Sequence, residues 1–170
     1  MPEDYSDSRR RFIGYAIGGM VGAITFGYAV PIVNYIVRPS LAKAESDWSK
    51  VGSVDGLAEG VPTSLAFTAR EKVGWQEKTV PHDVWAVKRA DGTVTAFSPI
   101  CPHLGCGYRW DDTQKKFVCP CHLSIYDIEG KVLGGPAPRG LDTLPAKVED
   151  GVLYVKYEKF RLGVSDKAVA

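Results

Sequence analysis

The first quarter of the chain carries a long apolar stretch that the remainder lacks. Residues 12–37, 26 positions in all, contain no charged side chain. At 1.5 Å per residue, a helix of this length extends about 39 Å, enough to cross a hydrocarbon core ~30 Å thick. The stretch also exceeds the roughly 7–15 apolar residues of a signal-peptide core. We therefore expect a transmembrane anchor over 12–37 that is retained, although Ala42-Lys43-Ala44 has the form of a cleavage site.

From residue 61 onward the pattern changes to short strands separated by turn dipeptides. Residues 84–90 alternate and are rich in β-forming side chains, and Asp91-Gly92 is a strong hairpin signal before the next strand at 93–97. Further strands are expected at 116–118, 125–128, 131–133, 146–148 and 152–157, with turns at 129–130 and 150–151. Because no long helical period interrupts them, the sequence predicts a mainly β, antiparallel domain over 61–170.

Three parts of the chain lie outside these patterns. Residues 38–60 combine small, charged and glycine positions, and we expect them to form a hinge or linker. The tail, 163–170, is expected to be loosely held. His82 belongs to no motif, and we expect it to be an ordinary loop residue.

Composition narrows the possibilities further. The 170 residues leave room for one anchor and one domain of about 125 residues, which is a usual domain size. With 21 basic and 20 acidic side chains the net charge is +1, which gives no reason to expect a nucleic-acid partner. The chemistry is concentrated elsewhere, in the cysteines and histidines.

All four cysteines and two of the three histidines fall between residues 101 and 122. They form two boxes, Cys101-Pro102-His103-Leu104-Gly105-Cys106 and Cys119-Pro120-Cys121-His122-Leu123-Ser124. Two cysteines with two histidines suffice for one metal site, and two cysteines then remain for a disulfide. A structural zinc site could use the same four ligands, and a disulfide scaffold with incidental histidines is a second alternative.

The ligand pattern C-x-H, fifteen residues, C-x-x-H resembles the Rieske iron–sulfur proteins, whose boxes are commonly C-T-H-L-G-C and C-P-C-H-G-S. The resemblance implies that Cys101 and Cys119 bind one iron of a 2Fe–2S cluster. His103 and His122 would bind the other iron and are the expected catalytic residues. It also implies a disulfide between Cys106 and Cys121. Zinc would need neither this second cysteine pair nor the residues described next.

The resemblance extends to the surroundings of the cluster. Ser124 and Tyr126 match positions whose hydroxyls donate hydrogen bonds to the cluster and its ligand sulfur, which raises the reduction potential. Residues 134–138, Gly-Gly-Pro-Ala-Pro, resemble the family's proline loop, so Gly135 and Pro136 are expected to cover the cluster together with Leu104. Leu123 departs from the pattern, because the family usually has glycine there.

Mixed ligation has a physical consequence. With neutral imidazoles, two ferric irons, two sulfides and two thiolates sum to zero charge, whereas four thiolates leave a net negative site. Rieske centres accordingly have potentials of roughly −150 to +300 mV, against about −400 mV for plant-type ferredoxins. An imidazole can also carry a proton, so that electron uptake can be coupled to proton uptake.

The amino terminus indicates where the domain would function. Ser8-Arg9-Arg10-Arg11-Phe12-Ile13 resembles the twin-arginine export motif S-R-R-x-F-L. We therefore interpret residues 1–11 as a cytoplasmic signal region, with the β domain on the outer face of a bacterial cytoplasmic membrane. The implied disulfide agrees with an oxidising compartment.

The resemblance as a whole implies a Rieske-type antiparallel β domain with a cluster-binding subdomain at about 99–140. The implied function is that of the electron-transfer subunit of a cytochrome bc- or bf-type quinol:cytochrome c oxidoreductase. Its partners would be a cytochrome b subunit, a c-type cytochrome, membrane quinol and the lipid bilayer. The small subunit of an exported arsenite oxidase, which relays electrons from a molybdenum subunit, is the alternative, and a stand-alone electron carrier is a third.

Overall fold

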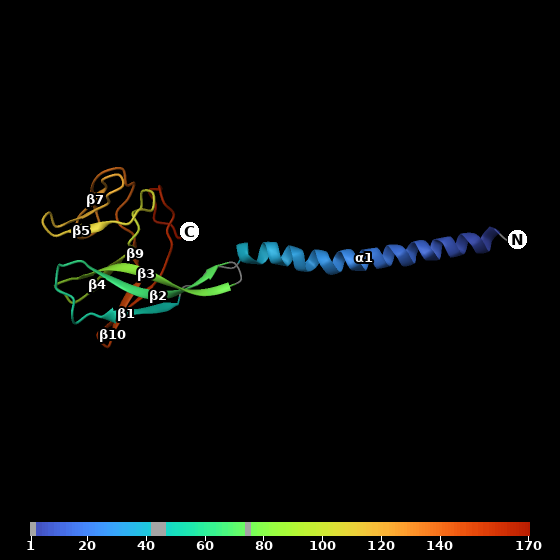
Figure 1. Cartoon of the computed structure of the whole chain (residues 1–170), viewed down its shortest axis with the longest axis horizontal. Coiled ribbons are helices and arrows are strands. Elements are labelled where there is room, and N and C mark those ends of the chain that lie inside the picture. Colours follow the sequence, from blue (N-terminus) through green and yellow to red (C-terminus); the bar gives the residue numbers. More distant parts are fainter. Residues whose placement is uncertain (1–2, 42–46, 74–75) are drawn as a thin grey trace. The chain divides into compact units, whose positions relative to one another are not determined.

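The computed structural model describes residues 3–41, 47–73 and 76–170, and it divides the chain into two compact units, Met1–Ala44 and Glu45–Ala170 (Figure 1). The first unit contains α1, Glu3–Leu41. The expected helix over 12–37 is confirmed, and it is longer at both ends. Its segment Asp7–Val37 is long and apolar enough to cross a membrane, and the large apolar side chains of that segment are exposed.

The described part of the second unit is built from strands. These are β1 (Trp48–Ser53), β2 (Thr63–Val73), β3 (Gln76–Lys88), β4 (Val94–Phe97), β5 (Arg109–Asp111), β6 (Lys116–Val118), β7 (Ile125–Tyr126), β8 (Val132–Gly134), β9 (Thr143–Leu144), β10 (Ala146–Glu149) and β11 (Val152–Lys156). Every pairing between these strands is antiparallel, which confirms the expected fold class.

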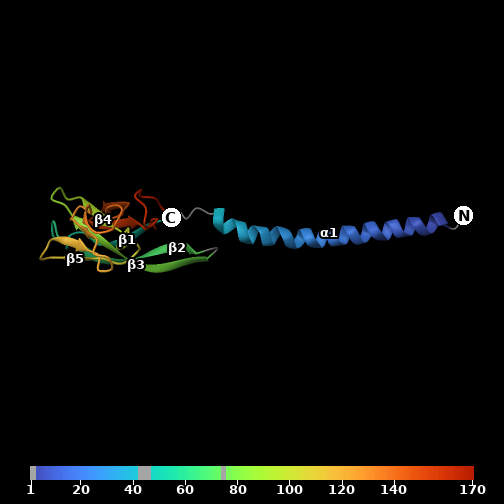
Figure 2. The ribbon, with the colours of Figure 1, turned by 90° about the horizontal axis from the view of Figure 1, so that it is seen from above.

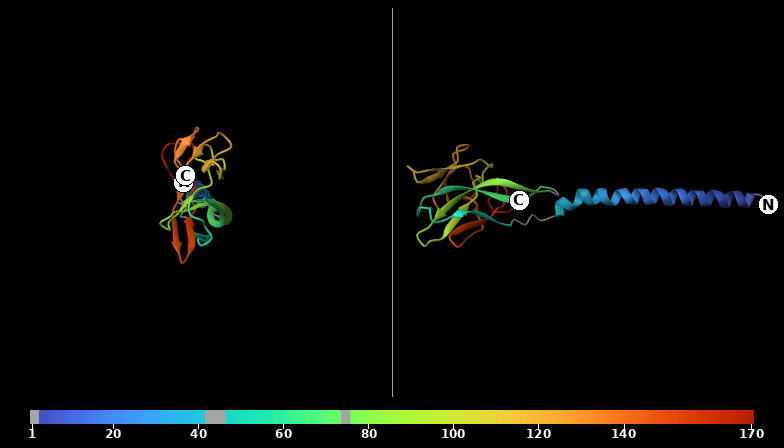
Figure 3. Two further views of the ribbon diagram at one scale, coloured as in Figure 1. Left: turned by 90° about the vertical axis from the view of Figure 1, so that its left-hand side faces the viewer. Right: turned by 60° about the horizontal axis from the view of Figure 1, so that its bottom comes forward.

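The strands form three small sheets in the orders β1-β11-β10, β2-β3-β4-β9 and β5-β6-β7-β8. The third sheet is inserted in the chain between β4 and β9, which pair with each other through Ala96 and Leu144. Figures 1 and 3 show this inserted sheet on one side of the four-stranded sheet β2-β3-β4-β9 and β10 and β11 on the other. Figure 2 shows the same ribbon from above. A small subdomain inserted in a larger one is the arrangement that the family resemblance implies.

Two apolar cores hold these layers together. In β11 the strand alternation places Leu153 and Val155 inward, where both are fully buried in the larger core with Val84. The smaller core lies under the inserted sheet and is dominated by aromatic rings, among them Phe117 and Tyr126. Buried aromatic side chains contribute a large apolar area each, which compensates for the shortness of these strands.

The predicted linker over 38–60 is wrong for its second half. Strand β1 lies inside it and pairs with β11, and Val54 and Leu57 are buried in the larger core. Glycines suggested flexibility, but the pairing register shifts between Lys50 and Gly52, so Gly52 follows an irregularity within a strand. Of the remaining positions, 42–46 lie outside the described residues.

His82 was predicted in a loop, and this too is wrong. It lies within β3, which begins at Gln76 rather than at residue 84 and pairs with β2 along the whole of that strand. Pro81 and several charged side chains concealed this hairpin, because proline and charge are unfavourable in most strands. The imidazole stacks on Tyr157 at 3.7 Å between ring centroids, and its Nε2 lies 2.8 Å from Oε1 of Glu71.

The tail is also held more firmly than its composition suggested. Phe160 and Val169 form an isolated antiparallel bridge, and the Ala170 N–H donates to the Lys159 carbonyl. Nζ of Lys167 donates to the carbonyl of Thr143 in β9. The expectation of a loose terminus is therefore wrong, because backbone and side-chain hydrogen bonds hold the tail although its valines are exposed.

Candidate metal centre

The first box folds into a tight loop whose two ends are joined by an isolated β-bridge between Ile100 and Gly107. The Cys101 N–H donates to the Cys106 carbonyl at 2.8 Å, and the Gly105 N–H donates back to the Cys101 carbonyl at 3.1 Å. Gly105 has a φ of +84°, which closes the loop. These bonds bury Cys101, while Leu104 next to His103 stays exposed.

The second box repeats the same hydrogen-bond pattern. The Cys119 N–H donates to the Ser124 carbonyl at 2.9 Å, and the Leu123 N–H donates to the Cys119 carbonyl at 3.0 Å. The residue corresponding to Gly105 is Leu123, with a φ of +59°. The two boxes are therefore conformationally equivalent loops, and each starts with a buried cysteine.

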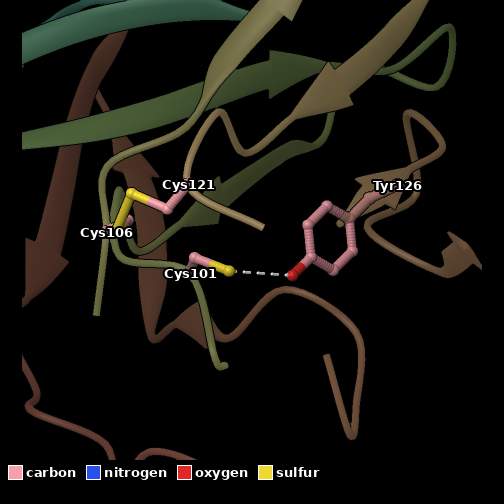
Figure 4. Close-up of a disulfide and its surroundings, with 4 residues drawn as sticks. All are labelled: Cys101, Cys106, Cys121 and Tyr126. Atoms are coloured by element: carbon pink, nitrogen blue, oxygen red, sulfur yellow. Dashed lines mark hydrogen bonds between the residues drawn. A yellow bond between two sulfur atoms is a disulfide. The ribbon is translucent and has the colours of Figure 1, made fainter. Parts of the chain in front are cut away.

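The loops are joined by a disulfide between Cys106 and Cys121, fifteen residues apart (Figure 4). This is the pairing that the family resemblance implied. Cys101 and Cys119 remain as free, buried thiols. A disulfide scaffold would use all four cysteines, so the division between free and bridged cysteines favours a metal site. The sulfurs of Cys106, Cys119 and Cys121 gather within 4.8 Å, but two of them are bonded to each other.

The two histidines of the boxes lie together at the surface. The rings of His103 and His122 meet edge to face, with 4.7 Å between their centroids. His122 is exposed and His103 is half-buried. The site thus has two buried thiols on its inner side and two accessible imidazoles on its outer side.

The electrostatic surroundings of Cys119 suit a metal-bound thiolate. Burial raises the pKa of the Cys119 thiol, and the nearby Cys101 raises it further. Backbone N–H groups of Cys121 and His122 are directed at the sulfur and oppose this rise in pKa. A positive metal ion would supply the remaining stabilisation of the thiolate.

Two hydroxyls are directed into the same region. The hydroxyl of Tyr126 lies 3.1 Å from Sγ of Cys101, and Figure 4 shows the two groups pointing toward each other. Burial, followed by the contact with Cys101, raises the pKa of Tyr126. Oγ of Ser124 is fully buried, lies near the Tyr126 hydroxyl, and has no hydrogen bond of acceptable geometry among the described residues. A buried hydroxyl without an acceptor is rare unless a bound group supplies one.

These observations test whether the donor set fits the implied cofactor. A [2Fe–2S] cluster with mixed ligation needs two thiolates, two imidazoles and hydrogen-bond donors toward its sulfurs. The site offers two free thiols, two adjacent imidazoles and two hydroxyls, one of them unsatisfied. The residues present therefore fit the cluster, and a structural zinc site would leave the Ser124 hydroxyl unexplained.

The proline loop packs directly on the second box. Gly135 has a φ of +89°, and a Cβ at this position would lie 2.5 Å from Cα of Ser124. Glycine is thus required for the loop to approach the box closely. Ala137 is buried in the smaller core, whereas Pro136 is exposed.

A buried ion pair behind the proline loop escaped sequence analysis. Nε and Nη2 of Arg139 donate to the two carboxylate oxygens of Asp142 at 2.9 and 2.7 Å, and the side chains are only 8% and 3% exposed. The Asp142 carboxylate raises the pKa of Arg139. Arg139 also donates to the carbonyl of Val164 in the tail and to that of Arg161 just before it. The signal available was an Arg and an Asp three residues apart, directly after the proline loop.

The tail and an aromatic ring complete the support of the first box. The Gly163 N–H donates to the Pro102 carbonyl at 2.9 Å, next to His103. The hydroxyl of Tyr108 is buried and donates to the Ser98 carbonyl at 2.6 Å, just before the box. Nothing in the spacing of the boxes pointed to either contact, because both come from outside the motif.

The sequence of this chain is similar to those of several known proteins. A family model described as Rieske [2Fe-2S] domain matches residues 47–145. The chain is 35% identical to the menaquinol:cytochrome c reductase iron–sulfur subunit of Bacillus subtilis over 153 residues, 87% of this chain and 90% of that protein. It is 32% identical to the cytochrome b6-f complex iron–sulfur subunit of Trichodesmium erythraeum over 172 residues, 95% and 93% of the two chains. Among solved structures, the plasma membrane Rieske protein PetC3 from Synechocystis PCC 6803 is 32% identical, with 64% of this chain and 98% of that chain covered and a TM-score of 0.45.

Proposed function

This chain belongs to the Rieske [2Fe-2S] family, and we propose that it is the electron-transfer subunit of a membrane-bound quinol:cytochrome c oxidoreductase of the bc or bf type. Relatives from quinol-oxidising and b6-f complexes match it over most of its length. They support this function over the small subunit of an arsenite oxidase. The expected partners are a cytochrome b subunit, a c-type cytochrome and a membrane quinol.

Each residue of the site has a distinct role in this proposal. Cys101 and Cys119 would hold one iron and His103 and His122 the other, and the bound group would accept and pass on one electron at a time. The Tyr126 hydroxyl, 3.1 Å from Sγ of Cys101, and the unsatisfied Ser124 hydroxyl would donate hydrogen bonds toward the sulfurs of the bound group. The Cys106–Cys121 disulfide fixes the two loops relative to each other.

The two imidazoles also give the site a means of handling protons. One of them can accept a hydrogen bond from a quinol hydroxyl at the ring nitrogen that does not bind iron, and can then take the proton. The rings lie at the surface, where a quinol can reach them. The proline loop, which packs closely on the second box, would limit the access of water to the inner side of the site.

The first unit supplies the location. Helix α1 would serve as a retained, single-pass anchor, and residues 8–13 would direct export through the twin-arginine pathway. In this orientation the amino terminus stays in the cytoplasm and the cluster domain lies on the outer face of the membrane. The disulfide is compatible with that compartment.

The observation that carries the proposal is the pair of free, buried thiols beside two adjacent surface imidazoles. Low-temperature EPR of the dithionite-reduced protein, with redox titrations at several pH values, tests it. We expect a rhombic signal with an average g below 2 and a potential that falls above neutral pH. A colourless, EPR-silent protein containing zinc would contradict the proposal. The quinol function is tested separately, by adding quinol to membranes that contain the intact complex and measuring reduction of the cluster.

A further inference from the structure

Leu123 occupies a backbone conformation that leucine avoids. Its φ is +59°, in the left-handed region where the Cβ of an L-residue crowds the following carbonyl oxygen. Among the described residues only Lys115 and Asp150 share such a φ without being glycine. Lys115 and Asp150 are polar residues in exposed turns, whereas Leu123 lies directly beside His122.

The equivalent loop shows that the conformation itself does not require leucine. Gly105 takes the same place in the first box, with the same backbone hydrogen bonds around it. A Cβ at Gly105 would lie 2.9 Å from Cδ1 of Leu162, so a side chain there would require the end of the Leu162 side chain to move. At Leu123 the side chain instead projects outward and is 66% exposed. The leucine at position 123 therefore both strains the backbone and exposes an apolar side chain.

The surroundings of Leu123 indicate what would cover it. Leu104, which follows His103, is 62% exposed, and the two histidine rings are in contact. The loops 101–107, 119–124 and 134–138 contain no Asp, Glu, Lys or Arg. Partners that dock through charge complementarity need charged groups on both surfaces. A surface of leucines, prolines and imidazoles instead suits an apolar, uncharged partner, whose contact would bury the leucine side chains.

We propose that Leu123 is a docking residue that inserts, beside Leu104, into the apolar mouth of the quinol pocket on the membrane-embedded partner subunit. This inference rests on the proposed quinol function. The strain at Leu123 is retained because burial of its side chain against the partner offsets it. Strained residues cluster at binding sites for this reason.

The test uses membranes that contain the intact complex, with Leu123→Gly and Leu123→Asn compared with the unsubstituted chain. Glycine removes both strain and side chain, whereas asparagine keeps a similar size and tolerates positive φ but is polar. We expect both variants to slow the single-turnover reduction of the cluster by quinol about tenfold, because the apolar contact is lost. The midpoint potential should stay unchanged. The thermal midpoint of the Leu123→Gly domain should stay equal or rise by about 2–5 °C.

Lys115→Gly is the matched control, because Lys115 has a φ of +52° in an exposed turn at the other end of β6 from the site. It should melt no lower than the unsubstituted chain and leave reduction by quinol unchanged. Quinol reduction that is as fast in both Leu123 variants as in the unsubstituted chain would overturn the inference. A defect confined to re-oxidation by the c-type cytochrome would overturn it as well, since the partner would then be a different one. If quinol does not reduce the cluster in the unsubstituted complex, the proposed function fails instead.

Discussion

At the scale of single residues, the Tyr126 hydroxyl is expected to tune the potential of the site. It lies 3.1 Å from Sγ of Cys101, and only the hydroxyl can donate once the sulfur is a thiolate. A hydrogen bond to a charged acceptor contributes about 1.5–3 kcal/mol, and a tenfold change in a one-electron equilibrium is about 59 mV. Because the bond is stronger in the more negative reduced state, Tyr126→Phe should lower the midpoint potential by about 60 mV, measured by EPR-monitored titration.

The pKa of Tyr126 and a neighbouring tyrosine sharpen this prediction. Burial raises the pKa of Tyr126, so the hydroxyl stays protonated at alkaline pH and the offset should be constant from about pH 6 to 10. Tyr108→Phe is the control, because the Tyr108 hydroxyl is also buried but donates to the Ser98 carbonyl. It should cost stability and leave the potential in place. Equal shifts in both variants would show that packing, and not the hydrogen bond to sulfur, sets the potential.

At the scale of elements, the Arg139–Asp142 pair is expected to hold the proline loop and the tail together. Replacing one member of a buried ion pair leaves the other charge uncompensated, at a cost of about 3–5 kcal/mol. Arg139→Leu should therefore lower the free energy of unfolding by this amount in chemical denaturation, and the double variant with Asp142→Leu should recover part of it. The exposed Arg109 provides a control, since Arg109→Leu should change the free energy of unfolding by less than about 0.5 kcal/mol. No recovery in the double variant would mean that the tail carbonyls, rather than the carboxylate, are the main partners of Arg139.

Some of the elements could be predicted from the sequence, and others could not. Turn dipeptides located the hairpins correctly, because Asp91-Gly92 and Asp150-Gly151 encode their backbone conformation locally. The spacing of cysteines and histidines within each box predicted a metal centre in the same way, because that spacing is also a local property of the sequence. The long pairing of β2 with β3 and the attachment of the tail depend on partners distant in the chain, such as Tyr157 against His82. Polar strands and polar tails carry no hydrophobic period, so only the folded structure reveals these contacts.

At the scale of the whole molecule, the proposed export route predicts a link between location and disulfide formation. Disulfides such as Cys106–Cys121 form and persist mainly in oxidising compartments, and the motif at residues 8–13 directly precedes the apolar part of α1. Replacing Arg9 and Arg10 together by lysine preserves the charge but removes the twin-arginine pair. We expect this variant to remain in the cytoplasm, with Cys106 and Cys121 reduced. Fractionation combined with thiol alkylation of the unfolded chain measures location and redox state together.

Arg11→Lys is the matched control for export, because position 11 is the variable one in the motif and its side chain lies 4.0 Å from Asp7. That variant should be exported and should carry the disulfide. If the double-lysine variant were also exported and oxidised, the basic flank would act only through its charge, and another translocation route would deliver the domain. A cytoplasmic variant that still contained the disulfide would separate the two properties, since the stability of the clamped loops would then outweigh the reducing compartment. The proposed coupling of folding and location therefore requires that the double-lysine variant stay in the cytoplasm and that its Cys106 and Cys121 be reduced.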